Sequence, residues 1–447
     1  MSHWQSTVFA VLNHPTEPSV LLIPDQGKWS LPLSRFEHRV WIRPEFKVNQ
    51  VFGKVLGCPV IVLHCISYQQ NKETQCEEGV FAFKMTGEMY ISTTPNQWLD
   101  RNRLARIDLT DESKRPLLET HLQELETGSI PTHRPPWTRP GWFSKASFWL
   151  EESLRSQDLQ PTGPVQQYRN WCLSAILTVP TAEGTVYFKA SQKQQLFPNE
   201  AEVLQNLSIL FPKQIPKPLA VDVYKGWFVL PDLGESLTKN ATVTDAVDLV
   251  KVLGNMQLRT AGKEDELLKM GCVKRDVAIM PKELERLLND PRIANGLTAA
   301  EELLLPNCQD RLSGCCGELS AHNIPNALVH GDFHLDNAVR REKDILLFDW
   351  ADAAVSHPFL DLIHLYDRYK SQSKSLLSAY FLNWIDFESS VQLNRLWSAA
   401  VPLGYLYSAL SYWYKLTEFE PASRAGFNGA EIMFLRNLLD EIDSLRL

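Results

Sequence analysis

The stretch from residue 326 to residue 350, NALVHGDFHLDNAVRREKDILLFDW, constrains the fold more than any other part of the chain. Two short apolar runs, ALV and ILLF, each lead into a cluster of Asp, Asn and His side chains. Short apolar runs bounded by polar residues predict buried strands. Carboxylates at strand ends repel one another and are costly to bury. The stretch therefore predicts strand ends that meet at a functional site.

The spacing of the polar residues suggests how their charge is used. Asp332 lies two residues after His330 and five before Asn337, and Asp349 follows Asn337 by twelve residues. Oxygen ligands at several points suit Mg²⁺, which prefers oxygen and keeps positions for water and phosphate. Asp332 is then an anion beside the metal that can orient an attacking hydroxyl and accept its proton. The reaction class predicted is phosphoryl transfer to an alcohol.

The same stretch carries a family resemblance. HGDFHLDN keeps the His, Asp and Asn of the kinase catalytic loop at their spacing, and DWA stands where D-F-G would. With Gly331, Trp350 and the sequel SHPFLDL, it resembles the aminoglycoside phosphotransferase and choline kinase branch of the protein-kinase-like fold. The resemblance implies that Asp332 is the catalytic base and that Asn337 and Asp349 are the metal ligands.

Upstream segments fit the same resemblance. VYFKA resembles the strand with the phosphate-binding lysine, which implies that Lys189 binds the nucleotide phosphates. NEAEVLQNL resembles the helix that follows, with Glu200 holding that lysine and Glu202 as the alternative. WFVLPDLG resembles the segment that meets adenine. The nucleotide-contacting residues implied in it are Leu230, Asp232 and Leu233.

One kinase element is missing. The turn around QYRNWCLSA has no G-x-G-x-x-G, so Ser174 or neighbouring amides would have to contact the phosphates. SHPFLDL follows Asp349 closely and leaves little room for an activation segment, which argues against a protein kinase. Asp361 is the structural acid that the branch implies. Three further polar residues are expected to support the loop: His330, His334 and Asp336.

The resemblance implies an ATP- and Mg²⁺-dependent enzyme with an α+β, bilobal fold. Residues 161–238 would form a small antiparallel β lobe, and residues 239–447 a large helical lobe with the catalytic loop. The acceptor is a small-molecule hydroxyl that the sequence does not identify. A net-acidic lobe favours a cationic acceptor, and aromatic residues at 404–416 line either a core or an acceptor pocket. The alternative is a nucleotide-binding pseudokinase that acts as a regulatory or scaffolding protein.

The N-terminal region raises a second resemblance. WSLP and the later QVFGKVLGCPV are similar to the Nudix hydrolase fold, whose metal-binding helix carries R-E-x-x-E-E-x-G. Where Arg, Glu, Glu and Glu would stand, this chain has Gln50, Val51, Lys54 and Val55. These side chains supply no anionic oxygen, so metal binding there is excluded. Residues 1–127 are predicted to be a degenerate Nudix-like α/β accessory domain for substrate selection or homodimer contacts; a β-rich domain of another kind is the alternative.

Composition sets the remaining limits. Four prolines lie between 131 and 140, so residues 128–160 are predicted to be a linker followed by a helix. A net charge of −8 over 447 residues disfavours nucleic-acid binding. No apolar run approaches the roughly 18 residues of a membrane span, and the start lacks a signal-peptide pattern, so a cytoplasmic protein is expected. Eight scattered cysteines without C-x-x-C spacing predict free thiols.

Overall fold

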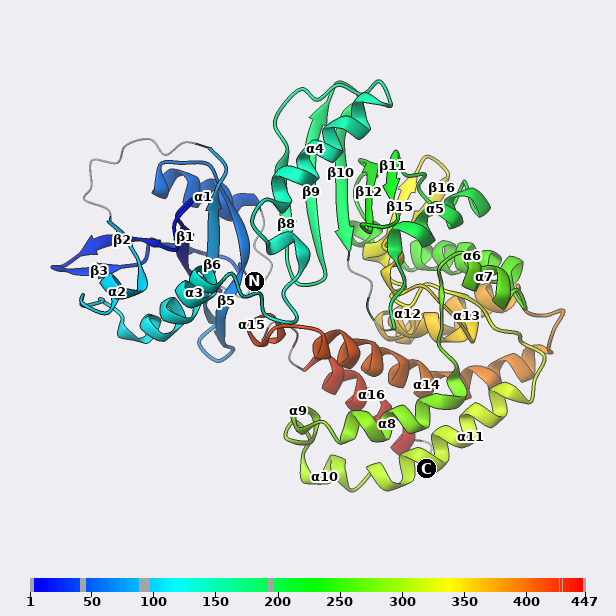
Figure 1. Cartoon of the computed structure of the whole chain (residues 1–447). Helices are drawn as coiled ribbons and strands as arrows, with labels where there is room; N and C mark the ends of the chain where they lie inside the picture. Colours follow the sequence, from blue (N-terminus) through cyan, green and yellow to red (C-terminus); the bar gives the residue numbers. More distant parts are fainter. Residues whose placement is uncertain are drawn as a thin grey trace. The chain divides into compact units, whose positions relative to one another are not determined.

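A computed structural model describes residues 4–40, 46–87, 97–191, 194, 196–425, 427 and 429–444 (Figure 1). The chain divides into two compact units. Unit 1 comprises Met1–Ala190 and Glu418–Asn428, and unit 2 comprises Ser191–Thr417 and Gly429–Leu447. The predicted domain boundaries at 127, 160 and 238 remain a prediction.

The first part of unit 1 is a mixed sheet with two longer helices. Its strands are β1 (Gln5–Asn13), β2 (Val20–Asp25), β3 (Lys28–Ser30), β4 (Leu33–Phe36), β5 (Val60–Asn71), β6 (Cys76–Met85) and β7 (Gln97–Leu99). Its helices are α1 (Phe46–Leu56), α2 (Arg101–Leu104) and α3 (Arg115–Thr127). The strand order is β3-β2-β1-β6-β5, with β4 added to β1 and β7 to β2. Strands β1 and β6 are parallel, and the other pairs are antiparallel.

Strand β1 is buried on both faces, which explains its unbroken apolar run. Val8 and Ala10 belong to one core with Phe52 of α1, whereas Phe9 and Val11 belong to another core that contains residues of α3. Continuous apolar runs are typical of strands covered on both sides. The four positions compared with the Nudix metal-binding motif lie on α1, and the Nudix-like identity of this region remains a prediction.

The second part of unit 1 continues the chain with α4 (Trp142–Arg155), β8 (Gln166–Asn170), β9 (Ser174–Thr181) and β10 (Gly184–Ser191). Strands β8, β9 and β10 are neighbours in that order, and the predicted turn between Thr181 and Gly184 is confirmed. The short helix α15 (Pro421–Arg424) also belongs to unit 1 and packs against β5.

Unit 2 is mainly helical. Its helices are α5 (Glu200–Leu210), α6 (Val243–Thr260), α7 (Glu264–Lys269), α8 (Met280–Leu288), α9 (Pro291–Ala294), α10 (Ala299–Glu302), α11 (Cys308–Ser320), α12 (Ile363–Arg368), α13 (Ser373–Phe381), α14 (Ser390–Thr417) and α16 (Ala430–Ser444). Its strands are β11 (Ala220–Asp222), β12 (Trp227–Pro231), β13 (Val273–Lys274), β14 (Ala327–Val329), β15 (Ala338–Arg341), β16 (Asp344–Leu347) and β17 (Ala354–Ser356).

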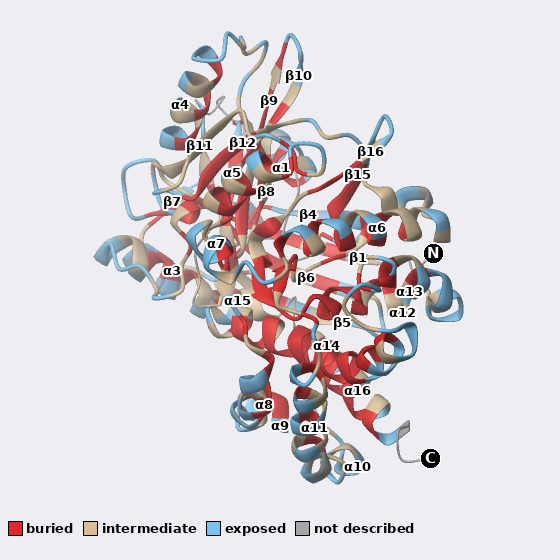
Figure 2. Ribbon diagram, turned by 90° about the vertical axis from the view of Figure 1, so that its right-hand side faces the viewer, coloured by how far each residue is buried: buried red, intermediate tan, exposed pale blue. Residues whose placement is uncertain are grey.

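Helix α14 forms the centre of the unit 2 core. It is 28 residues long and buried on most of its surface (Figure 2). It packs against α8, α11 and α16, and this explains why its sequence shows no single apolar face. The aromatic residues at 404–416 lie in this helix and are mostly buried, so most of them are core residues.

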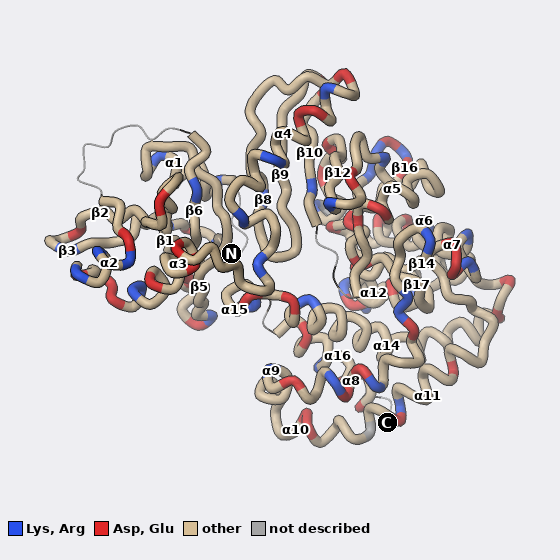
Figure 3. The backbone as a smooth tube through the Cα atoms, viewed as in Figure 1, with Lys and Arg blue, Asp and Glu red and all other residues tan. Residues whose placement is uncertain are grey.

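Two sequence predictions are confirmed, the fold class and the free thiols. The architecture is mixed α+β, and all eight cysteines are free. Among the described residues, no helix is long and apolar enough to cross a membrane. Basic and acidic side chains are interspersed along the helices of unit 2 (Figure 3).

Gln167 of β8 fills a gap in the hydrogen bonding of β5. Its Nε2 donates to the Val62 carbonyl at 2.8 Å, and its Oε1 accepts from the Val62 amide at 3.0 Å. Oε1 also accepts from Asn49 Nδ2 at 3.0 Å, and the Gln167 side chain is buried. Because β5 is the last strand of its sheet, the amide side chain takes the place of a neighbouring strand at its outer edge, next to the β-bulge at Leu63.

We expect Gln167→Leu to destabilise unit 1 by about 1–3 kcal/mol, the cost of one buried group left unpaired, because Asn49 Nδ2 loses its acceptor. The Val62 amide and carbonyl keep Asn49 Oδ1 and Asn170 Nδ2 as partners. Denaturant unfolding measures the loss, and hydrogen exchange should show faster exchange in β5. Gln123→Leu makes the same change at an exposed position of α3 and should have little effect. Equal stability of the two variants would contradict this account.

Candidate active site

A β-hairpin brings the two polar clusters of the 326–350 stretch together. Strands β15 and β16 pair antiparallel with Ala338 opposite Leu347. Asn337 directly precedes β15, and its carbonyl accepts from the Phe348 amide at 3.1 Å. Asp349 is the next residue after Phe348. The twelve-residue spacing is therefore the length of a hairpin that sets Asn337 beside the segment carrying Asp349.

The loop that carries Asp332 is held by a buried carboxylate. Asp361 accepts the His330 amide at 2.8 Å with Oδ2 and the Gly331 amide at 2.8 Å with Oδ1. Gln257 of α6 donates to Oδ2 at 3.0 Å. Burial raises the pKa of Asp361 to about 7, and these three donors act in the opposite direction. The structural acid that the sequence resemblance implied thus contacts the loop backbone directly.

Two residues of the loop have a fixed geometry. Gly331 has φ +81°, and a Cβ there would lie 2.3 Å from the Asp352 carbonyl oxygen, so only glycine fits. His330 is fully buried and donates from Nε2 to the Phe348 carbonyl at 3.1 Å. Burial lowers its pKa, so the ring is neutral. His330 therefore ties the loop to the end of β16, which is the supporting role expected of it.

Asp332 lies in a positively polarised environment. The amide of Asp336 donates to His334 Nδ1 at 3.2 Å, so His334 Nε2 carries a hydrogen and faces Asp332 Oδ1 at 3.3 Å. Burial acts to raise the pKa of Asp332, but the hydrogen bond with His334 and the charge of Lys415 lower it well below its usual range. Asp332 is therefore ionised at neutral pH.

Asn337 is oriented by the loop that contains Asp332. Its Nδ2 donates to the Asp332 carbonyl at 2.9 Å and lies 3.3 Å from Asp332 Oδ2. Its Oδ1 makes no hydrogen bond to any described residue, so an acceptor oxygen remains for another partner. Asp349 has φ +64°, a conformation that Asp adopts more readily than most residues. The charge of Asp349 acts to raise the pKa of both His330 and His334, so Asp349 lies near the loop.

Sequence reasoning did not identify Lys415 and Asp352. Lys415 Nζ at the end of α14 lies 2.7 Å from Asp352 Oδ1 and 2.9 Å from Oδ2, and both side chains are largely buried. Burial acts to lower the pKa of Lys415, but the charges of Asp352 and Asp332 raise it overall. The lysine is separated from Asp352 by 63 positions, so no local pattern could have indicated the pair.

The upstream candidates lie where the resemblance placed them along the chain. Glu200 begins α5 and is buried, whereas Glu202 is only partly buried, which favours Glu200 over its alternative. Lys189 lies on β10 and is partly buried. Lys189 belongs to unit 1 and Glu200 to unit 2. Their interaction remains a prediction.

The predicted nucleotide-contacting residues differ in their surroundings. Leu230 lies near the end of β12 and is partly buried, as is Leu233. Asp232 is exposed, and its Oδ1 accepts the Gly234 amide at 2.9 Å, so its side chain stabilises the turn after β12. Ser174 is buried at the start of β9, and its hydroxyl accepts from Trp171 Nε1 at 2.9 Å. That hydroxyl already has a partner, and a phosphate contact by Ser174 remains a prediction.

Comparison with protein families identifies the region that contains this loop. Residues 176–390 match the model of the family described as "Phosphotransferase enzyme family". The match to this phosphotransferase family covers just under half of the chain. The matched residues include Asp332, Asn337 and Asp349. The family resemblance inferred from HGDFHLDN and DWA is confirmed for this region.

Solved structures similar to the chain include several small-molecule kinases. Choline kinase LicA from Streptococcus pneumoniae matches at TM-score 0.49 and 15% identity, over 66% of this chain and 98% of that one. Spectinomycin phosphotransferase, solved with ADP and spectinomycin, matches at TM-score 0.46 and 11% identity, over 66% of this chain and 96% of that one. Plasmodium vivax ethanolamine kinase matches at TM-score 0.44 and 11% identity, over 74% and 89%. No curated protein matches the chain.

We expect Asp361→Asn to loosen the loop and to destabilise unit 2. An amide nitrogen would face one of the backbone N–H groups that now meet a carboxylate oxygen, and each buried group left unpaired costs about 1–3 kcal/mol. Thermal unfolding and hydrogen exchange at residues 329–333 measure the effect. Asp386→Asn at an exposed position is the matched control. Unchanged exchange at these residues would show that Asp361 does not hold the loop.

Proposed function

We propose that the chain is an ATP- and Mg²⁺-dependent phosphotransferase that transfers the γ-phosphate to a hydroxyl group of a small molecule. The observation that carries this proposal is the hairpin β15–β16, which sets Asn337 and the segment of Asp349 side by side next to Asp332. The phosphotransferase family match over residues 176–390 supports the same reaction class.

The residues present suit Mg²⁺ as the cofactor. Asn337 offers an amide oxygen without a hydrogen bond among the described residues, and Asp349 offers a carboxylate from the neighbouring strand end. Both are oxygen ligands, and a pair of protein ligands is usual for Mg²⁺ that also binds nucleotide phosphates. When bound, the ion would neutralise charge on the phosphates. In this proposal, Lys189 binds the nucleotide phosphates and Glu200 orients Lys189.

Asp332 acts on the acceptor in this proposal. Its low pKa makes it a weak base but keeps it ionised, so it accepts a hydrogen bond from the attacking hydroxyl and orients it. The proton transfers late, as the phosphoryl group adds to the oxygen and the hydroxyl becomes more acidic. His334 holds Asp332 Oδ1, which fixes the direction of the carboxylate.

The adenine-contacting role belongs to the end of β12, which carries Leu230, and to the following segment with Leu233 and the turn stabilised by Asp232. Ser174 or neighbouring amides would contact the phosphates.

We further propose that residues 1–127 are a degenerate Nudix-like accessory domain. We also propose that the protein works in the cytoplasm on a small acceptor that is cationic.

We expect Asp332→Asn to lower the rate of phosphoryl transfer by about 10²–10⁴-fold, the range for a general base, while nucleotide binding is retained. Coupled ADP release with ATP and Mg²⁺, screened over choline-like amines, aminoglycosides, macrolides and sugars, measures the rate. Calorimetry with a non-hydrolysable ATP analogue measures binding. Asp386→Asn removes an exposed carboxylate of unit 2 outside the loop and is the matched control.

Two outcomes would contradict this proposal. Full transfer activity in Asp332→Asn would remove Asp332 from the mechanism. Nucleotide binding by the wild-type protein without transfer to any acceptor in the screen would favour the pseudokinase alternative. In that case, binding should respond to changes at Lys189 but not at Asp332.

We expect Asp349→Asn to raise the Mg²⁺ concentration needed for half-maximal activity, because a neutral amide oxygen binds a hard dication more weakly than a carboxylate. Asn also tolerates the positive φ of this position, so the backbone is not strained. Titration of Mg²⁺ at saturating ATP measures the change. Asp344→Asn, on the same hairpin, is the control. An unchanged Mg²⁺ requirement would exclude Asp349 as a metal ligand.

A further inference from the structure

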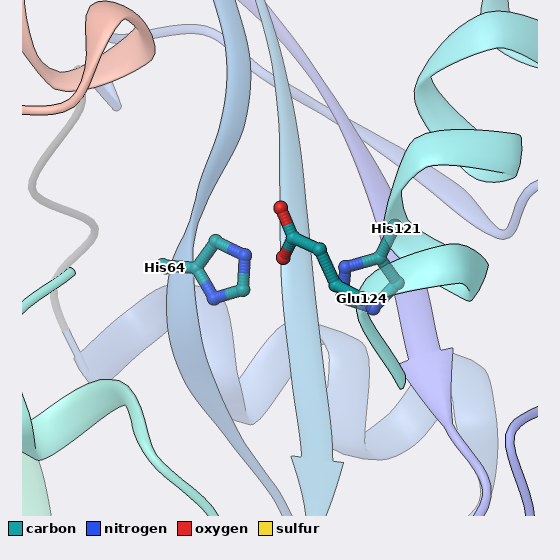
Figure 4. Close-up of side chains that lie close together, drawn as sticks. All are labelled: His64, His121 and Glu124. Carbon is teal, nitrogen blue, oxygen red and sulfur yellow. The ribbon is translucent and has the colours of Figure 1, made fainter. Parts of the chain in front are cut away.

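Three potential metal ligands meet in unit 1, and none of them belongs to the candidate active site. His64 lies on β5, and His121 and Glu124 lie on α3. The i and i+3 spacing places the two α3 residues on one face of the helix. One ligand atom from each of the three lies within 4.8 Å of the others. In Figure 4 the Glu124 carboxylate lies between the two imidazole rings.

A β-bulge positions His64. The pairing of β5 with β6 shifts register between Val62 and His64, so Leu63 is the extra residue. Bulges re-aim side chains and are frequent beside functional sites. The Nδ1 atom of His64 is buried without a hydrogen-bond partner in the described part of the chain. Burial of an unpaired polar atom costs free energy, so this ring favours a further partner.

His121 is already oriented as a metal ligand would be. Its Nε2 lies 2.7 Å from Asn13 Oδ1, and the amide oxygen can only accept, so Nε2 carries the hydrogen. Nδ1 then keeps its lone pair. A hydrogen bond from the remote ring nitrogen to an oxygen is the usual support of a metal-binding histidine.

Glu124 keeps one carboxylate oxygen for an ion. Arg134 Nη2 lies 3.2 Å from Glu124 Oε2, and Arg134 Nε donates to both oxygens of Glu420 at 2.7 Å. One guanidinium therefore faces two carboxylates, and this group carries a net negative charge before any ion binds. The Arg134 contact also fixes the carboxylate, as outer partners of metal-binding carboxylates do.

The cluster borders a cavity of about 190 Å³. His64, His121 and Glu124 line it together with Leu125, Ile130 and Arg134. Three protein ligands beside an open cavity leave a further coordination position for water or a small ligand, as in catalytic zinc sites. Ligand atoms around zinc are about 3.3 Å apart when the bonds are about 2.0 Å. Small side-chain rotations would bring these three atoms to that spacing.

We propose that His64, His121 and Glu124 form a binding site for a transition-metal dication, with Zn²⁺ as its first candidate. Two imidazoles and one carboxylate select zinc and its neighbours over Mg²⁺, which prefers oxygen ligands. The ion would tie β5 to α3. This site is independent of the proposed phosphotransferase activity, because all of its residues belong to unit 1 and none is among the residues proposed for phosphoryl transfer.

The test uses full-length protein without a histidine tag, dialysed against Zn²⁺ with excess Mg²⁺ present to occupy oxygen sites. We expect one zinc ion per chain by elemental analysis, and visible absorption bands of four-coordinate Co²⁺ when cobalt replaces zinc. Zinc should also raise the unfolding temperature of unit 1. Protein that retains no zinc after dialysis would overturn the proposal.

Variants locate the site. His64→Ala and Glu124→Gln should lose stoichiometric zinc and the cobalt bands, and Asn13→Ala should weaken zinc binding about 10–100-fold. His38→Ala removes an exposed histidine of the same unit and should bind as the wild type does. Glu124→Gln keeps the shape of the side chain and decides the test if His64→Ala does not fold. Zinc binding by Glu124→Gln equal to that of His38→Ala would overturn the proposal.

Discussion

The carboxylate of Asp361 is the interaction on which the candidate active site depends. It accepts two consecutive backbone N–H groups from the loop and a third hydrogen bond from Gln257. A buried carboxylate is stable only when its oxygens are paired, so the loop and the carboxylate require each other. Because Gly331 allows the backbone to pass close to Asp352, both amides can point at the same side chain.

The charges around Asp332 follow from this fixed loop. Burial acts to raise the pKa of Asp332, but the hydrogen bond with His334 and the charge of the buried Lys415 hold that pKa well below its usual range. Lys415 itself forms an ion pair with Asp352. This pair, which joins α14 to the segment after β16, therefore determines the electrostatic potential at the loop. This arrangement can orient a hydroxyl without making Asp332 a strong base, which suits phosphoryl transfer, where positioning and charge stabilisation dominate.

The two units present different ligand chemistry. The loop of unit 2 offers oxygen atoms, from Asn337 and Asp349, which suit Mg²⁺. The cluster on β5 and α3 of unit 1 offers two imidazoles and a carboxylate, which suit zinc. Because the two sites favour different metals, Mg²⁺ and Zn²⁺ can be used to examine them separately.

The sequence by itself determined the strands, the free thiols and the residue types of the candidate active site. The spacing of Asp332, Asn337 and Asp349 was readable because it reflects a tight loop followed by a hairpin, and both are local structures. The burial of Glu200 could be anticipated only through resemblance, because one helical glutamate resembles another in sequence.

The tertiary structure alone decided which distant residues complete each site. Asp361 meets Gln257 across 104 positions, Lys415 meets Asp352 across 63, and His64 meets α3 through a bulge that no sequence pattern marked. Local periodicity reports which face of an element is buried, but not which element covers it. Partners fixed by packing between distant segments therefore became visible only in the folded chain.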